Sequence, residues 1–264
     1  MTHDESGRPQ ALQIASARYT RPQEGTTFAV DLIGAVHVGD RGYYAELNQR
    51  FRIYDTVLFE LIAPPDTQHR IAETERKGFI TGAQLTLTRA LGLSFQLDEI
   101  DYGASNLVHA DLSPDELLDS MEERGESLYV YFWRMFYASV QQASEDPLGL
   151  RALSSLDSAL FAETDNPLKV AFAYEMTNVR ALGSALEGAS GSAVIAARNL
   201  RALDVLVERM DRGDRQVGIF YGVGHMPDFE RRLVNDMRFE YHDTRWVDAW
   251  RLDEPTDLPL GQDE

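Results

Sequence analysis

The sequence predicts an α/β fold: a single domain with a central sheet, helices between its strands and a helical insertion in its middle. Three observations predict it. Short apolar runs of strand length alternate with stretches whose apolar residues recur at helical spacing. From about residue 114 to 212 the sequence pattern is almost wholly that of helices. No low-complexity linker divides the 264 residues, a length that one large domain can fill.

Strands are expected where apolar and β-branched residues are bounded by turn residues. The turn Arg21–Gly25 joins the first two. Pro64 and Pro65 stop the third, because proline cannot donate a ladder hydrogen bond. The expected strands are 12–20, 26–38, 55–65, 94–102, 106–113 and 216–225, with a closing strand pair over 239–252.

Helices are expected where apolar residues repeat every three or four positions, as Tyr44, Leu47 and Phe51 do. Ser113-Pro114-Asp115-Glu116 starts a helix, because serine caps it, proline suits its first turn and glutamate completes a capping box. The expected helices are 41–54, 71–91 and 227–237, besides the helical stretch that follows residue 113. The expected organisation is a disordered start over 1–10, one domain over 11–252 with its helical insertion at about 114–190, and an acidic tail over 253–264.

Composition excludes several classes of function. The formal net charge of −18 repels phosphate backbones, so nucleic acid is not an expected partner. The absence of cysteine excludes disulfides, thiolate nucleophiles and iron–sulfur clusters, and leaves His, Asp and Glu to ligate any metal. No apolar run is long enough for a transmembrane segment, and the polar start has no signal-peptide core. The chain as written is expected to be soluble and cytoplasmic, or periplasmic or secreted if a leader has been removed; a homo-oligomer stays open.

One short motif occurs twice at strand ends. Gly34–Asp40 reads GAVHVGD and Gly222–Asp228 reads GVGHMPD, so both copies are Gly-x-x-His-x-x-Asp. The glycine that opens each copy permits a tight turn or the close approach of another group. Ligands bind beyond the carboxyl ends of strands in an open α/β sheet, so His37, His225 and the strand-end Glu60 are expected to converge. Two histidines and a carboxylate suit a divalent metal with an open position.

Each of these residues also has a structural interpretation. A single strand-end histidine such as His37 is usually a hydrogen-bonded core residue or a surface one, and a duplication without function could repeat the motif. Asp40 and Asp228 stand where a following helix favours an acidic residue in its first turn. Asp111 directly follows an expected strand, where it could orient a ligand or serve a turn.

Together these features resemble the TraB/GumN/Tiki group. The resemblance rests on the two Gly-x-x-His motifs, the glutamate in VLFELIAP and the ARN before an amphipathic helix, and it runs from about residue 15 to 250. The group belongs to a wider set with the erythromycin-esterase-like and haem-binding ChaN-like proteins. The resemblance therefore implies an EreA/ChaN-like core built from two related halves with helices between them. The middle of the chain, QLDEIDYGASNLVHADLS, departs from the pheromone-shutdown members and points to an unassigned bacterial branch.

The resemblance also implies a site made by His37, Glu60, Arg198 and His225. The histidines would hold a divalent metal, with Mn or Co favoured and Zn or Fe as alternatives. Glu60 would be a further ligand or the general base, and Arg198 would clamp a substrate carboxylate or an oxyanion. The residues expected to support this site from outside are Gly34, Asp40, Asp111, Gly222 and Asp228.

The function that follows from the resemblance is metal-dependent hydrolysis of a peptide or a small amide or ester. One alternative is a haem- or metal-binding protein of the ChaN-like type. The other is a regulator without catalytic activity that binds a peptide.

Overall fold

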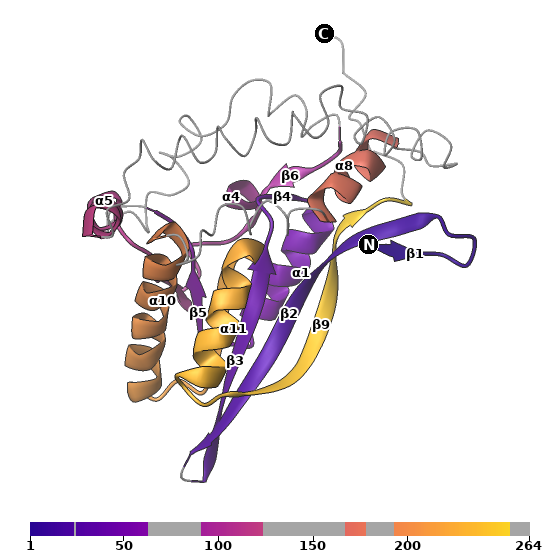
Figure 1. The fold of residues 1–264 in the computed structure, drawn as a ribbon. Helices are drawn as coiled ribbons and strands as arrows, with labels where there is room; N and C mark the ends of the chain where they lie inside the picture. Colours follow the sequence, from indigo (N-terminus) through magenta and orange to yellow (C-terminus); the bar gives the residue numbers. More distant parts are fainter. Residues whose placement is uncertain (24, 63–90, 124–166, 178–192, 254–264) are drawn as a thin grey trace.

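The computed structural model describes residues 1–23, 25–62, 91–123, 167–177 and 193–253. Within these ranges the chain forms a mixed sheet of seven strands with helices packed against it, so the predicted α/β fold is confirmed (Figure 1). Two helices of the predicted insertion are described, α5 (Pro114–Glu123) and α8 (Pro167–Thr177). The predicted helix over 71–91 and the acidic tail fall almost wholly outside the described residues.

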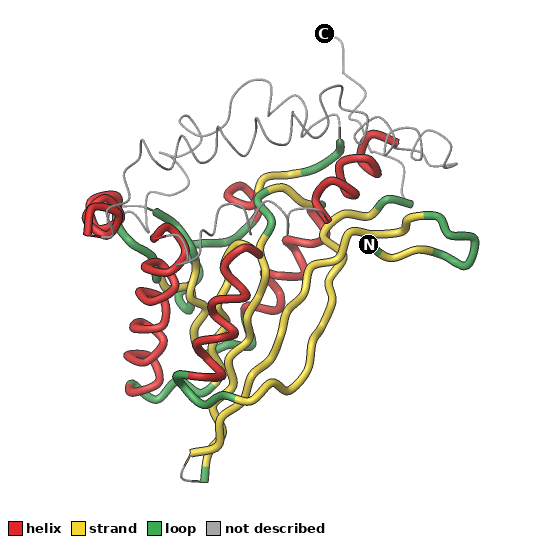
Figure 2. The backbone as a smooth tube through the Cα atoms, viewed as in Figure 1, coloured by secondary structure: helices red, strands yellow, loops and turns green. Residues whose placement is uncertain are grey.

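The large sheet contains β1 (Thr2–His3), β2 (Pro9–Gln23), β3 (Thr26–Ala35), β5 (Thr56–Phe59), β7 (Leu107–His109), β8 (Gln216–Gly222) and β9 (Glu240–Arg251). A separate two-stranded pair is formed by β4 (Val38–Gly39) and β6 (Ser94–Phe95). The other helical elements are α1 (Arg41–Phe51), α4 (Gln96–Glu99), α10 (Ala193–Asp211), the short 3-10 helix η3 (Val223–His225) and α11 (Met226–Asn235) (Figure 2).

Four parallel strands form the part of the sheet that positions the site. β3, β8, β5 and β7 lie side by side in that order. In this register Gly34 of β3 lies opposite Tyr221 of β8, and Phe59 of β5 lies opposite Phe220 of β8. The carboxyl ends of these strands therefore meet at one edge, which is where open α/β sheets bind ligands.

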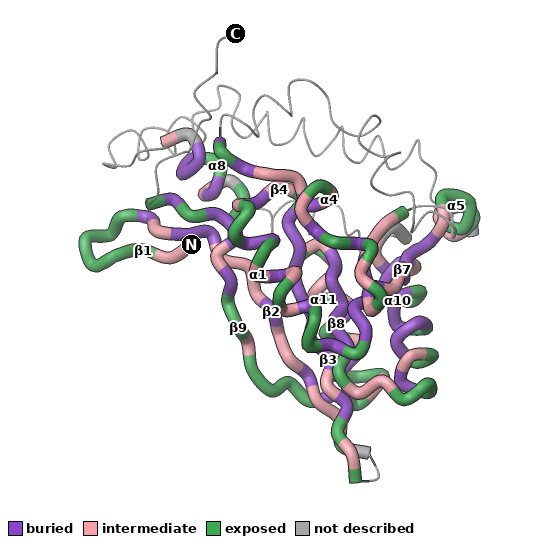
Figure 3. Tube along the Cα trace, turned by 180° about the vertical axis from the view of Figure 1, so that it is seen from behind, coloured by how far each residue is buried: buried purple, intermediate pink, exposed green. Residues whose placement is uncertain are grey.

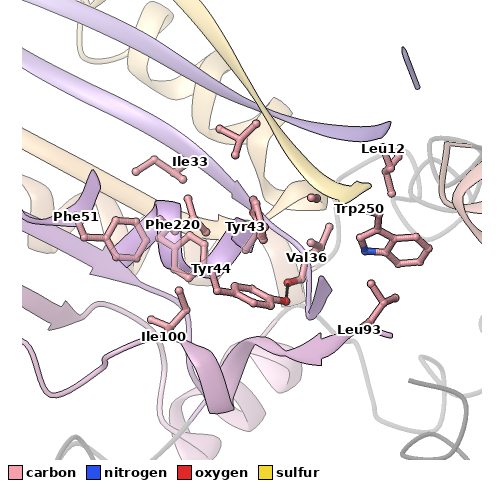
Figure 4. Packing of buried hydrophobic residues seen from close by; sticks show 14 of the residues in the cluster. Leu12, Ile33, Val36, Tyr43, Tyr44, Phe51, Leu93, Ile100, Phe220 and Trp250 are labelled. Carbon is pink, nitrogen blue, oxygen red and sulfur yellow. Dashed lines mark hydrogen bonds between the residues drawn. The ribbon is translucent and has the colours of Figure 1, made fainter. Parts of the chain in front are cut away.

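One buried cluster lies between α1 and the sheet. Tyr44 and Phe51 of α1 pack with Ile33 and Phe220 from the central strands (Figure 4). The hydroxyl of Tyr43 donates to the carbonyl of Gly34 at 3.0 Å, and that of Tyr44 donates to the carbonyl of Val36 at 2.9 Å. These bonds satisfy two buried hydroxyls and fix the backbone just before His37.

A second buried cluster packs α10 and α11 against the other side chains of the same strands. Leu206 of α10 and Phe229 of α11 are fully buried with Ile219 and Tyr221 of β8. Side chains of β8 alternate between the two clusters, as a strand between two helical layers requires. From behind, α10 is buried along one side and exposed along the other, as an amphipathic helix should be (Figure 3).

Two expectations about the ends of the domain are wrong. Residues 1–10 are ordered, because β1 pairs with β2 and the Asp4 carboxylate accepts the N–H groups of Ser6 and Arg8, both at 2.9 Å. The segment 239–252 is a single long strand, which pairs antiparallel with β2 from Thr20 opposite Glu240 to Ala11 opposite Arg251. Its partner lies more than two hundred residues earlier, so no local turn signal could reveal it. Nowhere in the described ranges is a helix long and apolar enough to span a bilayer.

Candidate functional site

Arg198 lies at the centre of a buried cluster of charged side chains. It comes from the first half of α10 and is 5% exposed. Its Nε donates to Asp111 Oδ1 at 2.9 Å, and its Nη2 donates to Asp111 Oδ2 at 2.6 Å and to Glu60 Oε1 at 2.7 Å. Burial alone would lower the pKa of Arg198, but the hydrogen bonds and charges of Asp111 and Glu60 raise it. Arg198 is therefore a fixed cation between two carboxylates.

Glu60 and Asp111 each follow a parallel strand and reach Arg198 from the sheet edge. The second oxygen of Glu60 accepts the N–H of Gly222 at 2.6 Å. Burial alone would raise the pKa of Glu60, but the charge of Arg198 and the hydrogen bonds from Gly222 and Arg198 hold it below its ordinary value. Glu60 is therefore an anion with both oxygens engaged, which makes it a weak base.

Gly222 permits the approach of Glu60 to the backbone of β8. A Cβ atom at this position would lie 3.2 Å from Glu60 Oε2. Such a contact is tighter than ordinary van der Waals packing, so any side chain here would push the carboxylate away. The glycine at the start of the second motif copy thus shapes the site directly.

His225 follows β8 at the end of η3 and is 7% exposed. Its Nε2 lies 3.6 Å from Glu60 Oε1 and 3.5 Å from Arg198 Nη1. Its ring packs edge-on against Tyr221, with the ring centroids 5.2 Å apart. Burial lowers the pKa of His225, and the attraction of Glu60 does not restore it. The imidazole is therefore neutral at pH 7, with one nitrogen directed at a carboxylate and a guanidinium.

Asn199 also belongs to the cluster, although the sequence interpretation did not single it out. It is fully buried beside Arg198 on α10, and its Oδ1 lies 2.6 Å from His225 Nδ1. Its Nδ2 donates to Asp228 Oδ2 at 2.9 Å and to the His225 carbonyl at 3.2 Å. The available signal was its place next to Arg198 in AARN, since adjacent helix residues can contact two different neighbours.

The first motif copy is arranged differently. His37 lies at the same edge of the sheet, but its side chain is exposed. Its carbonyl accepts the N–H of Gln96 at 2.9 Å, and no hydrogen bond or ion pair of its imidazole involves the described residues. Asp40 accepts from Lys169 Nζ of α8 at 2.7 Å and from the backbone N–H of Arg251. The predicted residues brought together are Glu60, Asp111, Arg198, Gly222, His225 and Asp228.

The donors in this cluster do not fit a resident metal ion. Both oxygens of Glu60 and both of Asp111 already accept N–H groups. The guanidinium of Arg198 lies where a metal shared by Glu60, Asp111 and His225 would have to sit. Consistently, no three His, Asp or Glu side chains in the described ranges form a group that could hold a metal. Ligation by His37 stays a prediction.

No family model, curated protein or solved structure matches the chain. The resemblance to the TraB/GumN/Tiki group therefore stays a prediction. The contacts, burial and charges of the Arg198 cluster are what support a function.

Proposed function

We propose that the protein is a hydrolase that cleaves a peptide or a small amide or ester, with His225 as its general base. One observation carries the proposal: the buried, neutral imidazole of His225 places Nε2 3.6 Å from Glu60 Oε1 and 3.5 Å from Arg198 Nη1. A base, a fixed anion and a fixed cation this close together can take a proton and stabilise the charges that result.

Water is the nucleophile in this proposal. The chain has no cysteine, and the described partners of Nε2 are Arg198 and Glu60 rather than a hydroxyl group. His225 Nε2 takes a proton from the water as its oxygen attacks the carbonyl carbon of the substrate. The carbonyl π electrons move to oxygen, which gives a tetrahedral oxyanion and an imidazolium.

Proton transfer changes what Arg198 can do. While Nε2 is unprotonated it can accept from Nη1 of Arg198, at 3.5 Å. Once Nε2 carries a hydrogen it can no longer accept, and Nη1 is released to donate to the oxyanion. The oxyanion then collapses, the carbon–nitrogen or carbon–oxygen bond breaks, and the leaving group takes the proton from Nε2.

Glu60 serves as the partner of the imidazolium. Its lowered pKa makes it a poor competitor for the proton, and its Oε1 lies 3.6 Å from the nitrogen that becomes charged. An opposite charge at this distance favours the protonated imidazole that forms during the reaction. We therefore assign Glu60 neither as base nor as metal ligand, but as a fixed counter-charge.

The test is a screen of fluorogenic esters, amides and short peptides with four proteins: wild type, Glu60→Gln, His225→Gln and the control His37→Gln. Loss of a general base typically costs about 10²- to 10⁴-fold in rate. We expect that loss for His225→Gln and a smaller one for Glu60→Gln. His37→Gln should retain the wild-type rate within about twofold, because its imidazole lies outside the cluster.

Equal rates in wild type and His225→Gln would defeat the proposal, since the activity would then come from elsewhere. A loss in His37→Gln as large as in His225→Gln would restore the two-histidine site. The same proteins are stripped of metal and reloaded with Mn, Co, Zn or Fe, with metal content measured by plasma mass spectrometry. Turnover by stripped protein fits the proposal, whereas turnover only after reloading would favour the metal-dependent reaction. A Soret band on adding haemin would support the haem-binding alternative.

A further inference from the structure

The side chain of Asn199 has its amide orientation fixed by two groups. Its Nδ2 lies 2.9 Å from Asp228 Oδ2 and 3.2 Å from the backbone carbonyl of His225. A carbonyl can only accept. Hydrogen bonds from Arg232 and Arg231, together with the charge of Arg232, keep Asp228 ionised by lowering its pKa against the effect of burial, so this carboxylate also only accepts. The NH₂ group of Asn199 must therefore face both, which leaves Oδ1 facing His225.

This orientation determines which nitrogen of His225 carries the hydrogen. Asn199 Oδ1, 2.6 Å from Nδ1, can only accept, so Nδ1 must donate. At the other side of the ring, Arg198 Nη1 is 3.5 Å from Nε2 and can only donate. The two contacts come from different residues and select the same tautomer: Nδ1 protonated and Nε2 with a free lone pair.

We propose that Asn199 is a positioning residue, which is oriented by Asp228 and holds His225 in its Nδ1–H tautomer. A free imidazole populates both tautomers, and the hydrogen bond at one nitrogen selects between them. We call this chain of hydrogen bonds, from Asp228 through Asn199 to Nδ1 of His225, the relay. It leaves the Nε2 lone pair facing Glu60 and Arg198. The catalytic consequence rests on the proposed function, whereas the tautomer itself does not.

The placement of these residues in the chain explains how a short sequence builds the relay. Arg198 and Asn199 are adjacent on α10, so one contacts the carboxylates and the next contacts the imidazole. Asp228 stands in the first turn of α11, three residues after His225. Its side chain therefore faces back toward the histidine of its own motif, where Asn199 bridges the two.

Removal of Asn199 should change which acceptor the imidazole of His225 donates to. Without Oδ1, a hydrogen on Nδ1 would lose its buried partner, a costly change for a group 7% exposed. A hydrogen on Nε2 would instead face Glu60 Oε1, 3.6 Å away, and would lose only the long 3.5 Å contact with Arg198 Nη1. The imidazole should then favour the Nε2–H tautomer, and its lone pair would point away from Glu60 and Arg198.

The experiment is long-range ¹H–¹⁵N correlation NMR of the full chain with ¹⁵N-labelled histidine at pH 8, where a histidine of lowered pKa is neutral. The proteins are wild type, Asn199→Ala and the control Asn48→Ala. Asn48 likewise uses both ends of its amide, but with the backbone carbonyl of Glu99 and the backbone N–H of Asp101. His225→Gln assigns the signal.

Wild type and Asn48→Ala should show Nδ1–H, and Asn199→Ala should move to Nε2–H. On any substrate found, Asn199→Ala should lower kcat about 10- to 100-fold with KM little changed, as loss of a residue that orients a functional side chain does.

Nε2–H in wild type, or Nδ1–H retained in Asn199→Ala, would overturn the inference. The wild-type spectrum decides even if a variant does not fold. Nδ1–H together with no turnover would defeat the proposed hydrolase alone. Turnover by a wild type in the Nε2–H form would defeat the relay and the role of Nε2 as the base, while the hydrolase activity itself would stand.

Discussion

At the residue scale, the two motif copies have the same sequence pattern but different roles in the structure. In the second copy, Gly222 admits the Glu60 carboxylate and His225 lies buried beside it. In the first, a Cβ atom on Gly34 would lie 2.8 Å from Cγ2 of Ile14, so this glycine serves the packing of two strands. If the packing of strands alone required the motif, the glycines of both copies would be expected to have the same role.

Substituting the two glycines separates these roles. Gly222 has φ −51° and ψ 141°, a conformation that alanine also adopts, so Gly222→Ala should cost little stability. It should displace Glu60 by a few tenths of an ångström and lower the hydrolysis rate about tenfold. The matched Gly34→Ala overpacks the core and should lower the free energy of unfolding by about 1–3 kcal/mol. Urea denaturation and rate measurements on both variants check this, and a reversed pattern would contradict it.

Sequence reasoning reached most of the site residues but not their arrangement. Glu60, Asp111 and His225 were found because each follows an apolar strand, and Arg198 through a family resemblance. Asn199 follows no strand, and its place next to Arg198 in AARN does not show that it is buried or that it contacts His225. The hydrogen bond from Arg198 to Glu60 likewise depends on distances in space that the spacing of residues in the sequence does not give.

At the element scale, the alternation of apolar runs and helices was enough to predict the class of fold. The order of the parallel strands was not predictable, because β8 lies between β3 and β5, which precede it by more than a hundred and fifty residues. The pairing of β9 with β2 was missed for the same reason. Long-range pairing is set by the packing of both sheet faces, and no window of sequence contains it.

Asp40 should hold elements together rather than act at the site. Its carboxylate joins α8 to the end of β9 through Lys169 and the Arg251 N–H, and the side chains of Asp40 and Lys169 are 19% and 8% exposed. Removing one member of a largely buried ion pair costs about 3 kcal/mol, so Asp40→Ala should lower the free energy of unfolding by about that amount.

Glu46→Ala is the matched control for Asp40→Ala. The Glu46–Arg245 pair likewise joins a helix to β9, in this case α1, but its side chains are 42% and 61% exposed. Loss of such an exposed pair should cost less than about 1 kcal/mol. Equal losses in the two variants, measured by urea denaturation at pH 7, would refute the structural role of Asp40.

At the scale of the whole molecule, a fall in pH should change the free energy of unfolding through two opposing effects. The net charge of −18 and pI of about 4.7 mean that mutual repulsion weakens as the pH falls from 7 toward 5. The buried His225 works the other way. Its pKa in the folded chain is below the ordinary 6.5, so below pH 6.5 the unfolded chain binds a proton here that the folded chain does not. Stability from this residue is therefore lost as the pH falls.

A comparison of wild type with His225→Gln isolates that second effect. Both proteins share the general charge effect, which cancels in the difference between their free energies of unfolding. Carboxylates with lowered pKa, such as Asp31 and Glu60, lose their contributions only below their ordinary values of 3.8 and 4.5. Between pH 8 and 7 the difference should be constant, and from 6.5 to 5.5 it should shift against wild type. Urea denaturation across this range measures it, and a flat difference would show that folding does not shift the pKa of His225.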